Sequence, residues 1–227
     1  TTRYHKRTLA GRPLHPETQM LSYCYDPMLS EGAIKPPVFL TSTFLFRSAE
    51  DGKTLFDVIG NRRPAPEGQA GGLVYSRYNN PNLEVLEDRM ALIDDAEDSL
   101  VFSSGMAAIS TTLLAYLRPG DCVAFTKPLY GATASVIEKF LTEFGVAWVA
   151  IEDATNIDNI RASIAKADGG RVRMILAETP ANPSNTLCDI EALAKVAREI
   201  GEKGKKPLLV VDNTLMGPVF QNPLKHG

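Results

Sequence analysis

Five short segments of the 227-residue chain combine residue types that can hold a small charged ligand. The first is S-S-G-M, where Ser104 and Gly105 precede an apolar helix. Backbone N–H groups at a helix start carry partial positive charge, and a glycine lets a ligand approach them closely, so this junction suits a phosphate. An ordinary serine cap followed by a packing glycine explains the same pattern, and the segment alone does not decide between the two.

The next two segments offer a carboxylate and an amide. In V-V-D-N-T, Asp212 follows an apolar run and Thr214 comes two residues later. A carboxylate at the floor of a cleft can hold a protonated ring nitrogen, and Thr214 could orient it; a turn or capping aspartate is the alternative. In E-T-P-A-N-P, Asn182 is placed to donate a hydrogen bond into the cleft, although two prolines also make a plain rigid turn.

The last two segments carry aromatic and basic side chains. Tyr130, in P-L-Y-G-A, opens a helix after a strand, where its ring could stack on a flat ligand or pack in the core. In Y-S-R-Y-N-N-P, Tyr75 and Arg77 are two residues apart on a segment expected to be extended. Their side chains would point the same way and could clamp a phosphate, whereas a surface arginine beside a partly buried tyrosine is the alternative.

The elements that position these segments alternate between strands and helices from Leu83 onward. Apolar runs predict strands over 99–103, 122–126, 146–151, 172–177 and 208–211, and helices are predicted over 83–93, 105–117, 132–144, 157–167 and 190–203. Continuously apolar strands are typical of a sheet covered on both faces. The sequence therefore predicts an α/β fold with a mostly parallel, doubly wound sheet, in which ligands bind at the carboxyl ends of the strands.

The first 72 residues are less regular. The stretch 38–46 is β-prone, and 60–72 is typical of an exposed loop because it contains two prolines and four glycines. The predicted organisation is an irregular N-terminal arm over 1–72 that contacts a neighbouring subunit, followed by one α/β domain over 73–227. A mobile terminus is the alternative.

Composition argues against several classes of partner. The formal net charge is −3 and the basic residues are spread out, so neither a nucleic acid nor a membrane surface is the expected partner. The three cysteines, Cys24, Cys122 and Cys188, are widely spaced without a C-x-x-C, which argues against a disulfide or metal site and favours a reducing cytoplasm. No apolar run is long enough to cross a bilayer.

As an ordered set, these segments resemble a family, the pyridoxal 5'-phosphate (PLP) enzymes of cysteine and methionine metabolism. The motifs are Y-S-R-Y-N-N-P, F-S-S-G-M-A-A-I, L-R-P-G-D, L-Y-G, E-T-P-A-N-P and V-V-D-N-T. The family includes cystathionine γ-synthase, cystathionine lyases, methionine γ-lyase and homoserine sulfhydrylases. The resemblance implies an aspartate-aminotransferase-like fold (fold type I), a homotetramer, and a lyase or transferase. Its reaction would be γ- or β-elimination, or γ-replacement, on homoserine-ester, cystathionine, cysteine or methionine-type substrates.

The resemblance also implies a role for each matching residue. The cofactor phosphate would be held by Ser104, Gly105 and Met106, the last two through backbone N–H groups, and reached from a neighbouring subunit by Tyr75 and Arg77. The pyridine ring would be bound by Tyr130 stacking on it and assisting proton transfer, Asp212 at the ring nitrogen with Thr214 beside it, and Asn182 at the ring hydroxyl.

Three departures qualify the resemblance. The family's cofactor-binding lysine follows a stretch like F-Q-N-P-L-K-H-G, which here ends the sequence at Gly227, and Lys225 belongs to that connecting stretch. A longer polypeptide is therefore expected, with a non-catalytic PLP-site or assembly module as the alternative. Ala132 stands where methionine γ-lyases carry a cysteine, which favours the synthase or general lyase branch, and the 60–72 loop looks longer than usual.

A Rossmann-type dinucleotide-binding protein would need a G-x-G-x-x-G after its first strand, which this chain lacks.

Overall fold

The computed structural model describes residues 7–64, 72–167 and 172–227. The chain divides into two compact units, Thr1–Val101 and Phe102–Gly227, which are described separately. Within the described ranges, no helix combines the length and apolar character needed to cross a membrane.

The C-terminal unit is built on a parallel sheet in the order β4-β3-β5-β6. Its strands are β3 (Cys122–Thr126), β4 (Ala147–Ile151), β5 (Val172–Glu178) and β6 (Leu208–Asp212). The two central strands, β3 and β5, are almost entirely buried, as their continuous apolar runs predict. In the register of the sheet, the last residue of β5, Glu178, lies beside the last residue of β6, Asp212.

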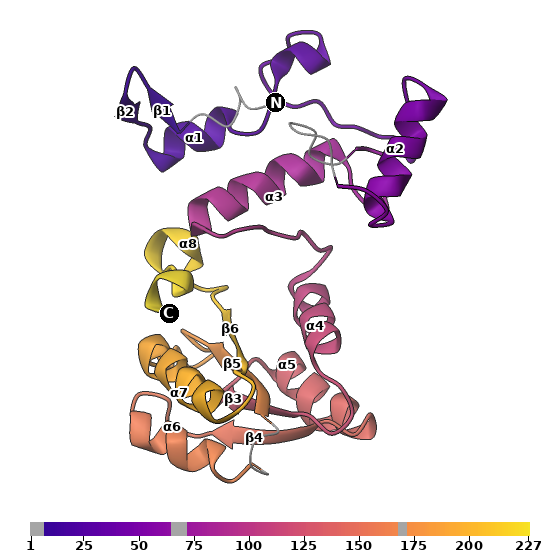
Figure 1. Cartoon of the computed structure of the whole chain (residues 1–227). Helices are drawn as coiled ribbons and strands as arrows, with labels where there is room; N and C mark the ends of the chain where they lie inside the picture. Colours follow the sequence, from indigo (N-terminus) through magenta and orange to yellow (C-terminus); the bar gives the residue numbers. More distant parts are fainter. Residues whose placement is uncertain (1–6, 65–71, 168–171) are drawn as a thin grey trace. The chain divides into compact units, whose positions relative to one another are not determined.

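Helices cover both faces of this sheet, which confirms the predicted doubly wound α/β fold (Figure 1). One face carries α4 (Gly105–Tyr116) and α5 (Gly131–Ser135), which continues as a π-helical segment, η3 (Val136–Leu141). The other carries α6 (Ile157–Ile164) and α7 (Ile190–Lys203). Two short segments, α8 (Gly217–Phe220) and η4 (Pro223–His226), follow β6.

Two hydrophobic cores lie on the two faces, and β5 contributes to both. Ile175 and Ala177 pack in the core beneath α6 and α7, whereas Met174 and Leu176 pack in the core beneath α4 and η3. Successive side chains of a strand point to opposite faces. This alternation directs Glu178, the next residue in the Met174–Leu176 series, toward the α4–α5 face.

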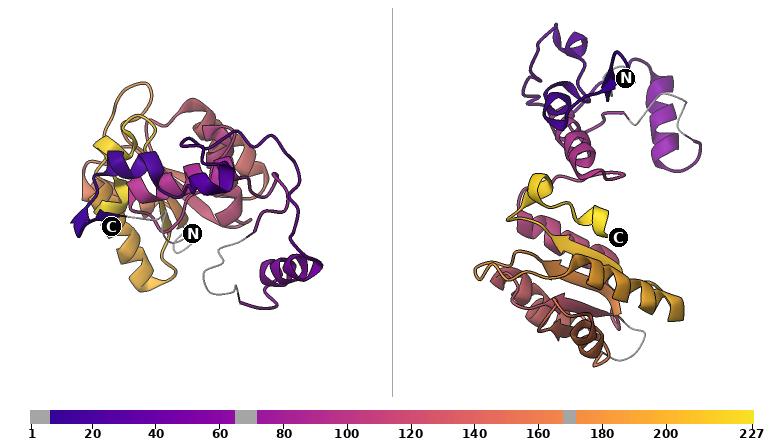
Figure 2. Two further views of the ribbon diagram at one scale, coloured as in Figure 1. Left: turned by 90° about the horizontal axis from the view of Figure 1, so that it is seen from above. Right: turned by 90° about the vertical axis from the view of Figure 1, so that its left-hand side faces the viewer.

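The N-terminal unit consists of short elements joined by irregular chain (Figure 2). They are a hairpin of β1 (Thr8–Leu9) and β2 (Arg12–Pro13), then α1 (Pro16–Ser22), the 3-10 segment η2 (Pro27–Ser30), α2 (Ala49–Ile59) and α3 (Pro81–Asp94). The sequence predicted α3 but neither α1 nor α2. Their starts carry local signals that hydrophobic periodicity does not reveal, namely Pro16 at the first turn and a Ser48 cap.

The predicted strand over 99–103 does not form, and the β-prone stretch 38–46 forms no strand. Residues 99–103 make no ladder, and the Val101 N–H donates instead to the Glu87 carboxylate at 2.9 Å. An apolar run forms a strand only where another segment pairs with it through backbone hydrogen bonds. Within 38–46, Thr43 makes one isolated antiparallel bridge to Tyr75. Of the predicted 60–72 loop, residues 60–64 form a turn and bends after α2, and 65–71 lie outside the described residues.

Candidate active site

A pocket of about 250 Å³ lies where α4 begins and β6 ends. Three residues that the sequence singled out line it: Gly105, Asp212 and Thr214. Thr133 of α5 and Asn213 line it as well, and the sequence did not point to either. The site therefore forms at the carboxyl end of a parallel strand, as the rule for open α/β sheets predicts.

The S-S-G-M junction forms the α4 side of the pocket. Ser104 caps α4, its Oγ accepting a hydrogen bond from the Ala107 N–H at 3.1 Å, so the ordinary cap interpretation holds for this side chain. A Cβ added to Gly105 would meet no atom within 4 Å, so the backbone at the start of α4 is open to a ligand. Met106 is held from α5, since the buried Thr133 hydroxyl lies 3.8 Å from its sulfur.

Asp212 is held by the threonine two residues later. Its Oδ1 accepts hydrogen bonds from the Thr214 N–H at 3.1 Å and from the Thr214 hydroxyl. The same D-x-T turn follows β4, where Asp153 Oδ1 accepts from the Thr155 N–H at 2.9 Å and from its hydroxyl at 2.6 Å. Hydrogen bonds from Thr155 and then Asn159 hold the pKa of Asp153 below its usual value. The turn is thus a local motif, and the position of Asp212 at the pocket distinguishes it.

Tyr130 and Asn182 come from different loops and share one partner. Tyr130 precedes α5 and is 40% exposed, and Asn182 lies in the loop after β5. The Asn182 N–H donates to Glu178 Oε1 at 2.8 Å, and the Tyr130 N–H donates to Glu178 Oε2. The sequence analysis missed Glu178, although a glutamate that ends an apolar strand and opens E-T-P-A-N-P was visible in the sequence.

The loops after β5 and β6 are tied together beside the pocket. The Thr179 N–H donates to the Asp212 carbonyl at 3.2 Å. Gln221 Nε2 donates to the Thr179 carbonyl and to Asn213 Oδ1, both at 2.8 Å, and Asn213 Nδ2 returns a bond to the Gln221 carbonyl at 2.8 Å. These contacts depend on the tertiary fold, and no sequence pattern signalled Gln221 or Asn213 as their carriers.

Tyr75 and Arg77 belong to the N-terminal unit and are described within it. Tyr75 pairs with Thr43, but the Tyr78 N–H bonds back to the Tyr75 carbonyl at 2.8 Å, so the chain turns at Ser76. The expected extended geometry is therefore wrong beyond Tyr75. The two side chains are neighbours nevertheless, with the Arg77 guanidinium 5.6 Å from the Tyr75 ring centroid and 4.6 Å from that of Tyr78.

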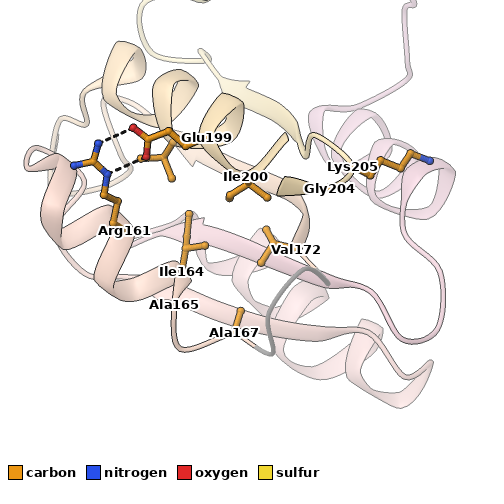
Figure 3. Close-up of a pocket in the computed structure, with 10 residues that line it drawn as sticks. Arg161, Ile164, Ala165, Ala167, Val172, Glu199, Ile200, Gly204 and Lys205 are labelled. Atoms are coloured by element: carbon orange, nitrogen blue, oxygen red, sulfur yellow. Dashed lines mark hydrogen bonds and ion pairs between the residues drawn. The ribbon is translucent and has the colours of Figure 1, made fainter. Parts of the chain in front are cut away.

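A larger hollow of about 530 Å³ lies between α6 and α7 (Figure 3). Its walls include Ile164, Val172 and Ile200, and a two-bond ion pair borders it, with Arg161 Nη2 and Nε 2.6 and 2.9 Å from the two Glu199 oxygens. Val172 is the first residue of β5, which puts this hollow at the amino ends of the strands. The pocket lined by Gly105 and Asp212 is the better candidate for the active site, because it lies at the carboxyl ends of the strands and carries convergent polar groups.

The family model and the curated relatives that match this chain agree with one another. The family model described as "Cys/Met metabolism PLP-dependent enzyme" matches residues 17–227. L-methionine gamma-lyase of Pseudomonas deceptionensis is 38% identical over 210 residues, 92% of this chain and 48% of that protein. Cystathionine gamma-synthase of Mycobacterium tuberculosis is 34% identical over 212 residues, 93% of this chain and 48% of that protein.

A solved structure shares the fold. The structure of a putative O-acetylhomoserine (thiol)-lyase from Campylobacter jejuni, which contains a pyridoxyl-lysine phosphate, superposes with a TM-score of 0.78. The two sequences are 27% identical, and the match covers 94% of this chain and 48% of that one. The chain thus spans about half the length of the curated relatives that it matches.

Proposed function

The chain belongs to the Cys/Met metabolism PLP-dependent enzyme family, and from that premise we propose that it supplies most of the cofactor-binding part of a sulfur amino-acid lyase or transferase. The reaction is γ- or β-elimination, or γ-replacement, on homoserine-ester, cystathionine, cysteine or methionine-type substrates. The relatives named methionine gamma-lyase and cystathionine gamma-synthase support this range. A small amino-acid substrate and a cytoplasmic setting remain parts of the proposal.

The pocket residues fit a flat, phosphorylated pyridine. Open space above Gly105 lets a phosphate reach the N–H groups at the start of α4, and Asp212 offers a carboxylate at the other side of the same pocket. The sequence lacks the G-x-G-x-x-G of a dinucleotide site, which argues against the Rossmann alternative.

Each residue has a task that its chemistry explains. When bound, PLP supplies an electron sink for the carbanion formed at the substrate α-carbon. Asp212 holds a proton on the ring nitrogen, and Thr214 orients that carboxylate through two hydrogen bonds to Oδ1. The N–H groups of Gly105 and Met106, with Ser104, bind the phosphate. Tyr130 covers the ring and assists proton transfer, and Asn182 binds the ring hydroxyl.

The shared pocket position of Gly105 and Asp212 is the observation that carries the proposal, and Asp212→Asn tests it. A neutral amide cannot hold the ring proton, so we expect turnover of cystathionine or O-acetylhomoserine to fall on the order of 10²-fold or more. Release of the oxo-acid or thiol product measures it. Asp153→Asn is the matched control, because it makes the same change in the same D-x-T turn away from the pocket.

The outcomes separate the proposal from its rival. Loss of turnover in Asp212→Asn alone supports the enzyme. Specific binding of PLP by the wild-type protein without turnover of any sulfur amino acid would favour the non-catalytic module. Equal turnover in both variants and the wild type would remove Asp212 from the proposed site.

We also propose that Tyr75 and Arg77 complete the phosphate site of a second copy of the chain, with residues 1–72 as the arm that contacts the neighbouring subunit. The stacked guanidinium and phenol rings support a preformed cluster able to receive a phosphate. Mixing Arg77→Ala subunits with Asp212→Asn subunits tests this. A site shared between subunits regains about a quarter of wild-type activity, because mixed dimers contain one intact site. A site built within one chain regains none.

The choice among reactions remains open within the proposal. Ala132 favours the synthase or general lyase branch, yet the methionine gamma-lyase relative has slightly higher identity, 38% against 34%. The half-buried position of Ala132, one residue before the pocket residue Thr133, makes Ala132→Cys informative. We expect this variant to raise the ratio of methionine cleavage to cystathionine formation, measured side by side. An unchanged ratio would separate Ala132 from the choice of reaction.

A further inference from the structure

Glu178 is a buried carboxylate between the loop that precedes α5 and the loop that follows β5. It ends β5 with 6% of its surface exposed. Its own N–H donates to the hydroxyl of the buried Thr126, the last residue of β3, at 3.2 Å. The residue is therefore fixed at the ends of two adjacent strands before its side chain is considered.

The two carboxylate oxygens of Glu178 join two different loops. Oε1 accepts from the Asn182 N–H at 2.8 Å, and Oε2 accepts from the N–H of Tyr130, 48 residues away in the sequence. Both partners donate through backbone N–H groups, so these bonds do not involve the Tyr130 and Asn182 side chains. The Glu178 side chain thus fixes the backbone positions of Tyr130 and Asn182 relative to each other.

A glutamate suits this position for a chemical reason. Two N–H donors require two acceptors, which a carboxylate has and a glutamine lacks, since its second terminal atom is itself a donor. Burying a charge is unfavourable unless it is well hydrogen-bonded, and bonds from N–H groups to a carboxylate are among the stronger ones. The nearby cation Lys127 pairs instead with Glu138 and Glu152, at 4.0 and 3.8 Å.

The neighbour of Glu178 in the sheet is Asp212, and the two carboxylates have separate donors. Glu178 lies beside Asp212 in the register of β5 and β6. Asp212 Oδ1 takes its bonds from Thr214, whereas Glu178 takes its bonds from the loops that carry Tyr130 and Asn182. Adjacent strand ends therefore hold two carboxylates with different partners: Asp212 lines the pocket, and Glu178 binds the backbone of Tyr130 and Asn182.

We propose that Glu178 is a positioning residue of the cofactor site, which acts through Tyr130 and Asn182 without touching the cofactor. This inference rests on the proposed function, because Tyr130 and Asn182 are assigned there to the pyridine ring. The stacking plane of the ring and the hydrogen bond to its hydroxyl are thereby set by one buried side chain.

The test compares Glu178→Gln with the wild-type protein and with Glu152→Gln. Glu152 follows β4, the edge strand on the far side of β3, and its side chain is 72% exposed and pairs with Lys127, so its variant makes the same chemical change at the surface. Amide hydrogen exchange of residues 127–131 and 179–185, without added cofactor, reports how firmly Glu178 holds the two loops together, an interaction called here the Glu178 clamp. PLP affinity and the visible circular dichroism of the bound cofactor then report ring placement. Glu178→Asp, which keeps both oxygens on a shorter stem, is the second variant.

We expect Glu178→Gln to speed exchange in both segments about tenfold, to weaken PLP binding about tenfold and to change the visible circular dichroism. Glu178→Asp shifts the same readouts in the same direction, and Glu152→Gln leaves them at wild-type values. Unchanged exchange in Glu178→Gln overturns the clamp, and faster exchange with unchanged PLP affinity and dichroism overturns its role toward the cofactor. Failure of the wild-type protein to bind PLP overturns the proposed function itself and this inference with it.

Discussion

The two units of the chain are held together in different ways. Among the described residues, Tyr25 is the one apolar side chain of the N-terminal unit that is buried, whereas the C-terminal unit buries two clusters on the faces of its sheet. The N-terminal unit relies on side chain–backbone hydrogen bonds, such as Tyr25 Oη to the Ala33 carbonyl at 2.7 Å and Asn82 Nδ2 to the Pro37 carbonyl at 2.8 Å. Burial of apolar side chains is the main source of folding free energy, and the C-terminal unit is the unit that buries hydrophobic cores of its own.

Several apolar side chains of the N-terminal unit are exposed. Leu40 is 93% exposed and Leu45 is fully exposed, and Ile34 is also exposed. Because the two units differ in the apolar surface that they bury, mutations in them are expected to have unequal effects.

The largest expected difference is between Leu193→Ala and Leu45→Ala. Leu193 of α7 is fully buried in the core between that helix and the sheet, so its truncation leaves a cavity and lowers the free energy of unfolding by about 2–5 kcal/mol. Leu45→Ala removes an exposed side chain and changes it by less than about 0.5 kcal/mol. Trp148, the single tryptophan of the 227 residues, reports denaturant unfolding of the C-terminal unit, and far-ultraviolet circular dichroism reports the helices of both units. Equal shifts in the midpoint would contradict the contrast between the units.

The same difference explains which elements the sequence predicted. In the C-terminal unit, β3 and α7 were predicted at their observed bounds, because burial on both faces imposes a continuous apolar run on β3 and burial of one face imposes helical periodicity on α7. In the N-terminal unit, α1 and α2 escaped prediction, since their apolar side chains do not line a core within the unit. Residues 99–103 show the opposite error: the apolar run predicted a strand, but no other described segment pairs with it.

The candidate site divides in a similar way. Residues at strand ends, such as Asp212 and Asn182, were predictable because chain order fixes which loops meet at the carboxyl edge of a parallel sheet. Glu178, Gln221 and Thr133 were not predicted, because their partners are backbone groups or side chains that only the tertiary fold brings near. Sequence motifs thus identified the residues assigned to the ligand but missed those that hold them.

A smaller effect is expected at the helix caps, where both units use the same device. Asp189 caps α7, its Oδ1 accepting from the Ala192 N–H at 2.9 Å, and Ser48 caps α2, its Oγ accepting from the Asp51 N–H at 3.1 Å. Loss of either cap costs about 1 kcal/mol of local helix stability. We expect Asp189→Ala to lower the unfolding midpoint of the C-terminal unit, whereas Ser48→Ala speeds hydrogen exchange within α2 alone. A matching loss of protection across both units in either variant would show that they unfold together.

At neutral pH the smallest effect on stability is expected from two cysteines that lie near acidic residues, Cys24 in the N-terminal unit and Cys188 in the C-terminal unit. Burial, a hydrogen bond to Asp88 and the charges of Asp88 and Glu84 raise the pKa of Cys24 to about 12. Burial also raises the pKa of Cys188, against an opposing hydrogen bond with Thr179. Because folding favours the neutral thiol, Cys24 contributes stability below its unfolded pKa of 9.0 that is lost as the pH rises toward 12.

Alkylation kinetics test the Cys24 prediction directly. The thiolate is the reactive form, so Cys24 reacts slowly at pH 9, with a thiolate fraction of about 10⁻³. Asp88→Asn removes the charge and weakens the acceptor, and it should raise the alkylation rate of Cys24 up to about tenfold while that of Cys188 in the other unit stays constant. Mass spectrometry of the two cysteine-containing peptides measures both rates in one sample. An unchanged Cys24 rate would leave burial and the charge of Glu84 as the causes of its raised pKa. Equal acceleration of both cysteines would mean that the substitution loosens the two units together.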